Sequence, residues 1–379
     1  MGIPRVLYGL TAALALAGCE GASSPGPEPT FIADGNPPTL SDWGMLAARD
    51  GQLIAGEGVE PYDLVTPLFS DHAGKFRTVW MPEGASAHYS EDGVFDFPVG
   101  TVITKTFFYA NGPDGGLMRG DEATNVWAEP EVLDLSRVHL VETRILVRRE
   151  EGWTALPYVW NAEQTEARLM RTGDAQTFEV ASAAGGINTV NYLVPNVNQC
   201  AGCHATNNTT RQIQPIGPAA RHLNREFDYA EGTGNQLEHL IAVGYLTGAP
   251  AAGDAPRAAD WTDTSLPIGD RARAWLDINC AHCHNPAGPA DTSGLYLDPG
   301  TEWGPNFGLC KTPIAAGPGS GGHRYDIVPG DPDQSILIFR LESLRPDVMM
   351  PELGRSIVHE ESVALIREWI ETLDGDCDA

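Results

Sequence analysis

Basic residues are scarce in this chain of 379 residues, which has 24 Lys and Arg against 51 Asp and Glu and a formal net charge of −27. Such an acidic surface repels phosphate backbones and anionic lipid headgroups. The composition therefore argues against a nucleic-acid-binding protein and against electrostatic docking on a membrane. It favours a basic partner protein.

Apolar runs long enough to cross a bilayer as a helix are also lacking. One short apolar run, residues 6–17, follows a single Arg and leads into Leu16-Ala17-Gly18-Cys19, a pattern that resembles a bacterial lipoprotein signal. We expect cleavage before Cys19, which would then carry lipid; an ordinary secretory signal is the alternative. Either signal exports the chain. Lipid on Cys19 would hold it on the periplasmic face of the inner or outer membrane, or on the cell surface.

Cysteine is scarce as well, with seven in the chain, yet four of the seven belong to two copies of one pattern. Residues 200–204 (CAGCH) and residues 280–284 (CAHCH) both have the form Cys-x-x-Cys-His. At this spacing two thiols form thioethers to one haem while the next His ligates its iron. We therefore predict two covalently bound haem c groups, attached at Cys200, Cys203, Cys280 and Cys283 and ligated by His204 and His284.

Two other interpretations of the cysteine pairs are weaker. A four-cysteine zinc site usually brings its pairs within roughly 15–20 residues of each other. The stretch between Cys203 and Cys280 is several times longer than that. A thioredoxin-like redox pair does not require a His after its second Cys, still less in both copies. Haem attachment is therefore favoured over both.

Two cysteines remain once the lipid and haem sites are assigned, Cys310 and Cys377. In an oxidising compartment such a leftover pair can join. We predict a Cys310–Cys377 disulfide that pins the C-terminal end to the loop before the Gly-rich stretch, with two free thiols as the alternative.

Strand-like patterns occupy the first half of the chain. Residues 141–148 alternate with a period of two, residues 101–109 are β-branched and aromatic, and residues 153–160 form another aromatic run. The Gly, Pro, Asn and Asp turns between these runs predict an antiparallel β-sandwich. The Gly-rich segments lack the Lys-Ser/Thr ending of a phosphate-binding loop.

Helical patterns follow Pro195. We expect short helices at 219–224 and 235–243, a helix that begins near Asp270 and delivers Cys280, and a last helix over about 359–373. The final pair has the plan of a small cytochrome c domain. The predicted fold is thus an N-terminal antiparallel β-sandwich followed by mainly α-helical cytochrome c-type haem domains. Its parts are a signal peptide (1–18), a flexible tether (19–38), the β-sandwich (39–194), a first haem segment (195–262) and a cytochrome c domain with the second haem (263–379).

The sixth iron ligands must come from outside the motifs. Met350, which is followed by Pro and stands far enough after His284 for the chain to wrap a haem, is predicted to ligate the second iron. Met349 is the fallback, and core packing is the alternative for both. No Met occurs between His204 and His284. The candidates for the first iron are His222, His239, Met81, Met170 or no ligand at all.

With these motifs the chain resembles a bacterial family of lipid-anchored dihaem c-type cytochromes. The resemblance covers nearly the whole mature chain and implies two haems, supports His204 and His284, and carries Met350. Relatives of the β region also occur attached to extracellular sugar dehydrogenases, which implies a periplasmic dehydrogenase as a partner. The resemblance is carried by TPLFSD (66–71), FDFPVGTVITKTF (95–107), GWTALPYVWNAEQTEA (152–167), PNVNQCAGCH (195–204), RARAWLDINCAHCHNPAGPADTSGL (271–295), YDIVPGDPDQSI (325–336) and MMPELGR (349–355).

The expected function is electron transfer by a periplasmic or cell-surface dihaem c-type cytochrome, between a redox partner such as a basic cytochrome or a dehydrogenase and a respiratory carrier. The alternative is an enzyme like a dihaem peroxidase, in which the first iron keeps an open position. A structural lipoprotein with passive haems is a third class. An electron carrier is favoured over a catalyst.

Overall fold

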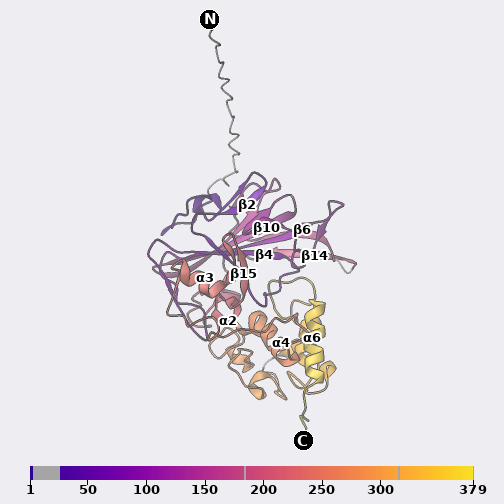
Figure 1. Ribbon diagram of the computed structural model, residues 1–379. Coiled ribbons are helices and arrows are strands. Elements are labelled where there is room, and N and C mark those ends of the chain that lie inside the picture. Colours follow the sequence, from indigo (N-terminus) through magenta and orange to yellow (C-terminus); the bar gives the residue numbers. More distant parts are fainter. Residues whose placement is uncertain (3–25, 183–184, 315, 379) are drawn as a thin grey trace.

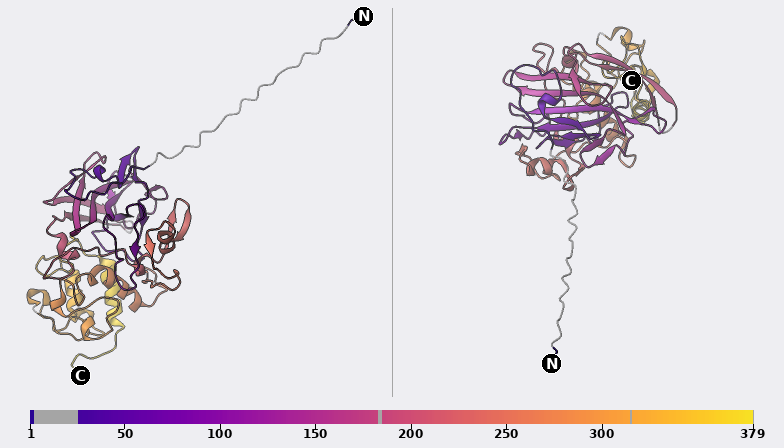
Figure 2. Two further views of the ribbon diagram at one scale, coloured as in Figure 1. Left: turned by 90° about the vertical axis from the view of Figure 1, so that its left-hand side faces the viewer. Right: turned by 90° about the horizontal axis from the view of Figure 1, so that it is seen from above.

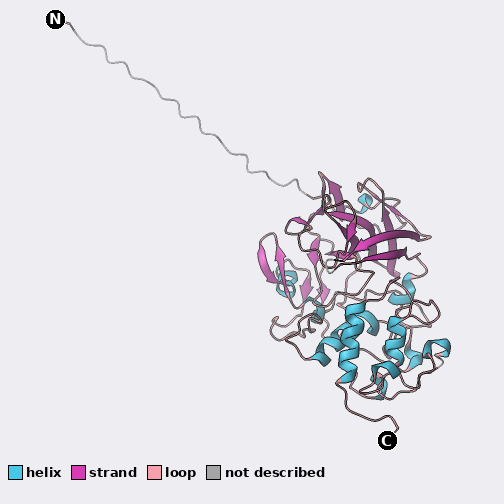
Figure 3. Ribbon diagram, turned by 90° about the vertical axis from the view of Figure 1, so that its right-hand side faces the viewer, coloured by secondary structure: helices cyan, strands magenta, loops and turns pink. Residues whose placement is uncertain are grey.

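The computed structural model describes residues 1–2, 26–182, 185–314 and 316–378. Cys19, nearly all of the predicted signal peptide and the first part of the predicted tether lie outside these residues. Most strands gather in one half of the molecule and the longer helices in the other, while α2 (Ala220–Leu223) and α3 (Gln236–Ala242) lie beside the strands (Figures 1 and 3). Strand residues outnumber helix residues, 28% against 18%.

A curled sheet with the form of a half-barrel is the largest unit, with nine strands in the described residues. Its strands are β3 (Glu60–Tyr62), β4 (Gly74–Trp80), β6 (Val102–Asn111), β7 (Leu117–Met118), β10 (Val138–Arg149), β11 (Gly152–Trp160), β12 (Ala167–Leu169), β13 (Asp174–Ala181) and β14 (Ile187–Val194). The order is β12-β11-β10-β6 on one side. The other edge of β6 pairs first with β4, which carries β3, and then with β7, which leads to β13 and β14.

Both faces of this sheet are covered, which explains why β6 is buried at nearly every position. Val102 and Phe108 pack on one face in a cluster with Trp43. Ile103 and Phe107, at alternate positions, pack on the other face. The predicted strands at 101–109, 141–148 and 153–160 are confirmed as parts of β6, β10 and β11.

A small four-stranded sheet covers the first face. Its strands, in the order β1-β2-β9-β8, contribute Leu46, Leu53 and Leu133 to the same core cluster. Phe31 and Ile32 pack against this cluster too, so part of the segment predicted as a tether lies on the folded body. The strands are β1 (Leu46–Arg49), β2 (Gln52–Ala55), β8 (Trp127–Glu129) and β9 (Val132–Asp134).

Residues after Pro195 cover part of the opposite face. Leu223 and Leu237 pack with Ile103 of the sheet, so this segment shares a core with the β region. The predicted helices at 219–224 and 235–243 are confirmed as α2 and α3. The elements here are β5 (Ala87–His88), α1 (Cys200–His204), α2 (Ala220–Leu223), β15 (Glu226–Tyr229), β16 (Gly232–Asn235), α3 (Gln236–Ala242) and β17 (Leu246–Thr247).

The C-terminal part has its own apolar core, in which Trp275 and Leu276 pack with Ile366 and Trp369. The predicted helix before Cys280 and the predicted last helix are confirmed as α4 and α6, and the predicted Cys310–Cys377 disulfide is present. The longer helices are α4 (Ile268–Leu276), α5 (Ile336–Glu342) and α6 (Glu360–Glu371), and the short turns are η1 (Ser41–Trp43), η2 (Asp277–Ala281), η3 (Asp291–Ser293), η4 (Pro305–Phe307), η5 (Gly317–Ser320) and η6 (Pro332–Gln334).

The predicted fold class, a β-sandwich followed by mainly α-helical haem domains, is wrong. A β-rich first part is present, but the chain as a whole is mostly β, and its main sheet is a curled half-barrel. After Pro195 the helices are short, with 12 residues in the longest, and long Gly- and Pro-rich loops connect them. Helical periodicity located these helices, but it said nothing of how much loop lies between them.

No helix in the described ranges is long and apolar enough to cross a membrane. Figure 2 shows the two halves from two further directions, with the C-terminal end on the side of the helices away from the main sheet.

Candidate functional site

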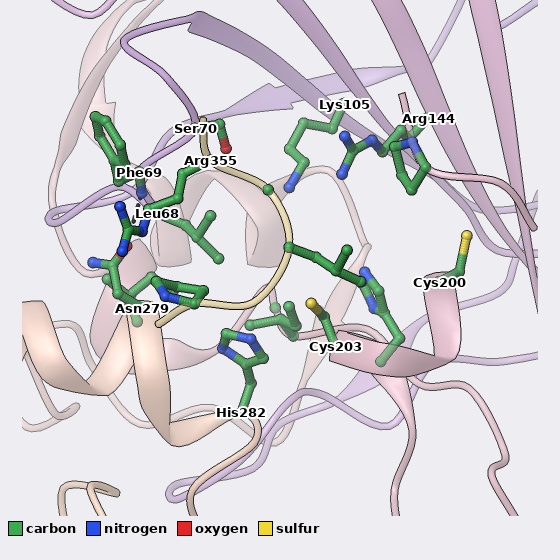
Figure 4. A pocket seen from close by; sticks show the side chains of 18 of the residues that line it. Leu68, Phe69, Ser70, Lys105, Arg144, Cys200, Cys203, Asn279, His282 and Arg355 are labelled. Carbon is green, nitrogen blue, oxygen red and sulfur yellow. Dashed lines mark hydrogen bonds between the residues drawn. The ribbon is translucent and has the colours of Figure 1, made fainter. Parts of the chain in front are cut away.

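A cavity lies between the main sheet and the helical half, and Figure 4 shows it from close by. Its volume is about 180 Å³. On the same measure a single water molecule needs only about 10–15 Å³. Apolar side chains such as Ile103, Ile278 and Leu341 make up much of its wall. The space therefore suits a large, mostly apolar group.

The first motif forms part of this wall. The Asn196 side chain accepts hydrogen bonds from the backbone N–H groups of Asn198 and Gln199, at 3.0 and 3.1 Å, and so turns the chain into α1. From α1, Cys200, Cys203 and His204 all line the cavity. Both thiols and the imidazole of the first Cys-x-x-Cys-His pattern thus face one space.

The ring of His204 is oriented by the backbone. Its Nδ1 lies 2.8 Å from the carbonyl oxygen of Gln214. A carbonyl only accepts, so Nδ1 carries the proton and Nε2 keeps its lone pair. Burial lowers the pKa of His204 to about 4, which favours the neutral ring. Metal-bound histidines are usually held in this way through the second nitrogen.

The second motif follows α4 through the π-helical turn η2. Single π-helical turns next to an α-helix occur frequently at functional sites. The N–H of His284 donates to the carbonyl of Cys280 at 2.9 Å, and the His284 Nδ1 lies 3.4 Å from Ser293 Oγ. Burial lowers the pKa of His284 to about 4 and raises that of the Cys280 thiol to about 12. These pKa shifts favour a neutral His284 imidazole and a protonated Cys280 thiol in the second motif.

The two motifs meet, although residues 200–204 and 280–284 lie far apart in the chain. The side chains of Cys203 and Cys283 hydrogen-bond to each other. The Cys283 Sγ also lies 3.4 Å from the carbonyl oxygen of Gly202, and the Asn208 amide donates to the carbonyl of Pro289 at 2.6 Å. The thiols of Cys203 and Cys283 are thus in contact, and we call this contact the junction of the two motifs.

Two cationic side chains enter the cavity from the sheet, Lys105 on β6 and Arg144 on β10 (Figure 4). Both lie over the ring of Phe107, with Lys105 Nζ 5.1 Å and Arg144 Cζ 4.5 Å from its centroid. Arg144 pairs with Glu142 at 2.5 Å. Lys105 has no ion pair or hydrogen bond within the described part of the chain, and burial lowers its pKa well below the usual range. An anionic group in the cavity would supply the missing partner.

The segment from Met350 to Arg355 crosses beside the first motif. Met350, predicted as a ligand of the second iron, lines this cavity together with His204, while Met349 is buried outside its wall. A Cβ on Gly202 would lie 3.3 Å from Leu353, which shows how closely the segment approaches α1. Arg355 fixes the segment by donating to the carbonyls of Met350 and Arg340, both at 3.1 Å.

Of the four residues proposed for the first iron, only His222 lines the cavity. It is buried, and its Nε2 lies 3.1 Å from Asp277 Oδ2, which also binds Arg221 at 2.6 Å. Although burial opposes ionisation, hydrogen bonds from His222 and Arg221 lower the pKa of Asp277 to about 2.

The other three candidates lie elsewhere. His239 binds Glu60 at 2.6 Å and stacks on Tyr229. Met81 is buried in an apolar cluster, and Met170 is absent from the wall of the cavity.

Sequence reasoning missed several polar residues of the cavity, among them Lys105, Arg144 and His282. Lys105 and Arg144 were noted only as parts of strands. His282, the third residue of the second motif, also lines the cavity of the first motif. The sequence did hold a signal for Lys105. This residue stands in the middle of a β-branched and aromatic run, and such a run is typical of a strand whose two faces are both covered, so a charged residue there is expected to be buried.

Among the residues that the structure describes, no three His, Cys, Asp or Glu side chains are arranged to hold a metal ion together, so a four-cysteine zinc site is not found there. Comparison with known proteins gives no match to a family profile, to a curated protein or to a solved structure. The resemblance to dihaem lipoproteins thus rests on the motifs alone.

Proposed function

We propose that the chain is an exported dihaem c-type cytochrome that passes electrons between a redox partner and a respiratory carrier, held at a membrane through lipid on Cys19. The observation that carries the proposal is the junction of the two Cys-x-x-Cys-His motifs, at which Cys203 touches Cys283 beside one large cavity. Two redox groups attached there would be close enough to exchange electrons.

The residues of the first site fit a covalent haem. The thiols of Cys200 and Cys203 would bind its vinyl carbons and His204 Nε2 its iron, because all three face the cavity and the Gln214 carbonyl holds the other ring nitrogen. Bound haem supplies one-electron redox chemistry. The apolar part of the wall would shield the group from water, and Lys105, which has no ion pair among the described residues, would pair with a carboxylate of the group.

The second site has the same donors in Cys280, Cys283 and His284. Met350 remains the proposed sixth ligand of the second iron, with Met349 as its fallback, although the Met350 side chain lines the cavity that also contains His204. A His/Met pair gives a higher reduction potential than a His/His pair. Unequal ligands would set the direction in which electrons pass between the two sites.

The test is to count covalent haem in the full-length protein, purified from a host that attaches haem c, by its pyridine haemochrome spectrum. Wild type should hold two haems. Cys200→Ser and Cys280→Ser should each lose one thioether bond to one haem, so that each variant keeps a single haem c with its normal attachment. The matched control is the double variant C310S/C377S, which removes the other cysteine pair and should keep both haems. Wild type without covalent haem would contradict the proposal.

A further inference from the structure

Three histidines beside the cavity, His222, His282 and His359, each have a buried Nδ1 atom without a hydrogen-bond partner in the described structure. A buried nitrogen without a hydrogen-bond partner destabilises the folded state. Each of these rings could therefore bind a group held in the cavity through its unpaired nitrogen.

The surroundings of the three rings distinguish them. His222 is fixed through Nε2 by Asp277 in a buried cluster with Arg221. His359 stacks on Phe69 with ring centroids 4.1 Å apart and also contacts Trp261. Both rings are thus held by groups that belong to neither haem motif.

His282 is the one of the three that contacts the first motif, because its ring hydrogen-bonds to the Cys203 side chain. It points from the second motif toward Cys203 and the cavity (Figure 4). The ring donates to the Cys203 sulfur. A thioether sulfur accepts more weakly than a thiolate, so attachment of haem at Cys203 would weaken this hydrogen bond. His282 lines the same cavity as His204, and its Nδ1 has no hydrogen-bond partner among the described residues, so a neutral imidazole there has an electron pair to offer an iron bound by His204.

We infer that His282 is the sixth ligand of the iron bound by His204. This inference rests on the proposed function. It makes the first site a His/His site and the second a His/Met site, which gives the first the lower potential. His282 also precedes Cys283 in the chain, so the ligand of the first iron and a thioether of the second haem are neighbouring residues. With His282 bound, no position is open to peroxide at the first iron.

The test uses the full-length protein loaded with both haems and compares wild type with His282→Ala by electron paramagnetic resonance of the ferric form and by carbon monoxide binding to the ferrous form. We expect two low-spin haems and almost no carbon monoxide binding in wild type. H282A should lose one of the two low-spin signals, gain a high-spin signal and bind one carbon monoxide per protein. The substitution leaves the Cys-x-x-Cys-His pattern intact, so attachment should be preserved.

Two further variants make the result specific. His282→Met replaces one ligand by another and should keep both haems low-spin while adding a second near-infrared methionine–iron band; it decides the matter if H282A fails to accumulate. His239→Gln changes a histidine that lies off the cavity, bound to Glu60, and should leave the spectra as in wild type.

Other outcomes would overturn the inference. An unchanged H282A spectrum with two attached haems would do so, as would a high-spin signal that arises from His222→Gln in place of H282A. Wild type without covalent haem would refute the proposed function and this ligand with it, whereas an unchanged H282A spectrum leaves the proposed function standing.

Discussion

Asp277 links the end of α4 to Arg221 and His222, and of these two residues His222 lines the cavity. Asp277 is buried in this position and binds both residues. Its pKa falls from an ordinary value of 3.8 to about 2 in the folded chain. As the pH drops, the unfolded chain therefore takes up this proton before the folded chain does. The stability that Asp277 contributes is complete above about pH 4 and is lost as the pH approaches 2.

Asp277→Asn should lower the free energy of unfolding by roughly 2–3 kcal/mol at pH 7, because a shift of about two pKa units corresponds to that much free energy. The difference in unfolding free energy between wild type and the variant should narrow as the pH falls from 5 toward 2. Urea titrations followed by circular dichroism at several pH values measure this difference. Asp374→Asn, at an exposed carboxylate, serves as the control and should show no such difference. A difference that does not depend on pH would contradict the ionic role.

At the scale of elements, the Cys310–Cys377 disulfide closes a loop of 67 residues around α5 and α6. Closing a loop of this length removes conformational entropy from the unfolded chain, worth about 4 kcal/mol by the chain-entropy expression and typically 2–4 kcal/mol in practice. The bond therefore stabilises the part that carries the second motif.

The double variant C310S/C377S should lose about 2–4 kcal/mol of unfolding free energy relative to oxidised wild type, measured by urea denaturation. Reductant should shift wild type toward the variant and leave the variant where it is. Equal stabilities of the variant and the oxidised wild type would show that the bond contributes nothing.

Elements were predicted better than their packing. The period of two in β10 and the apolar spacing in α6 are local properties, so sequence alone located both. The same pattern in β10 says which residues share a face but not what covers that face. The opposite cover turned out to be residues after Pro195, which pack on the sheet through Leu223 and Leu237, and the predicted second sheet of a sandwich is only a small four-stranded one.

The site shows the same limit. Each Cys-x-x-Cys-His motif is local and was found from spacing. The contact between Cys203 and Cys283 joins segments that are distant in the chain, and Lys105 of β6 lines the same cavity as residues after Pro195. Neither follows from any single stretch of sequence, so His282 was overlooked as a cavity residue.

At the scale of the whole molecule, the net charge of −27 governs encounters with other proteins. Electrostatic attraction between opposite charges can raise association rates by about 10–10³, and salt screens it. We expect electron exchange with a small basic cytochrome to slow at least about tenfold between 10 mM and 500 mM salt, measured by stopped-flow absorbance. An acidic cytochrome is the control and should react faster as salt rises. A rate with the basic partner that does not depend on salt would contradict electrostatic docking.

The contact between Cys203 and Cys283 has a consequence for maturation. In an oxidising compartment two thiols that touch can be oxidised to a disulfide. That bond would use one sulfur of each motif and cross-link the motifs before either could accept its prosthetic group. If the chain carries haem c as proposed, attachment would have to precede final folding, or a thiol reductant would have to keep this pair reduced until attachment is complete.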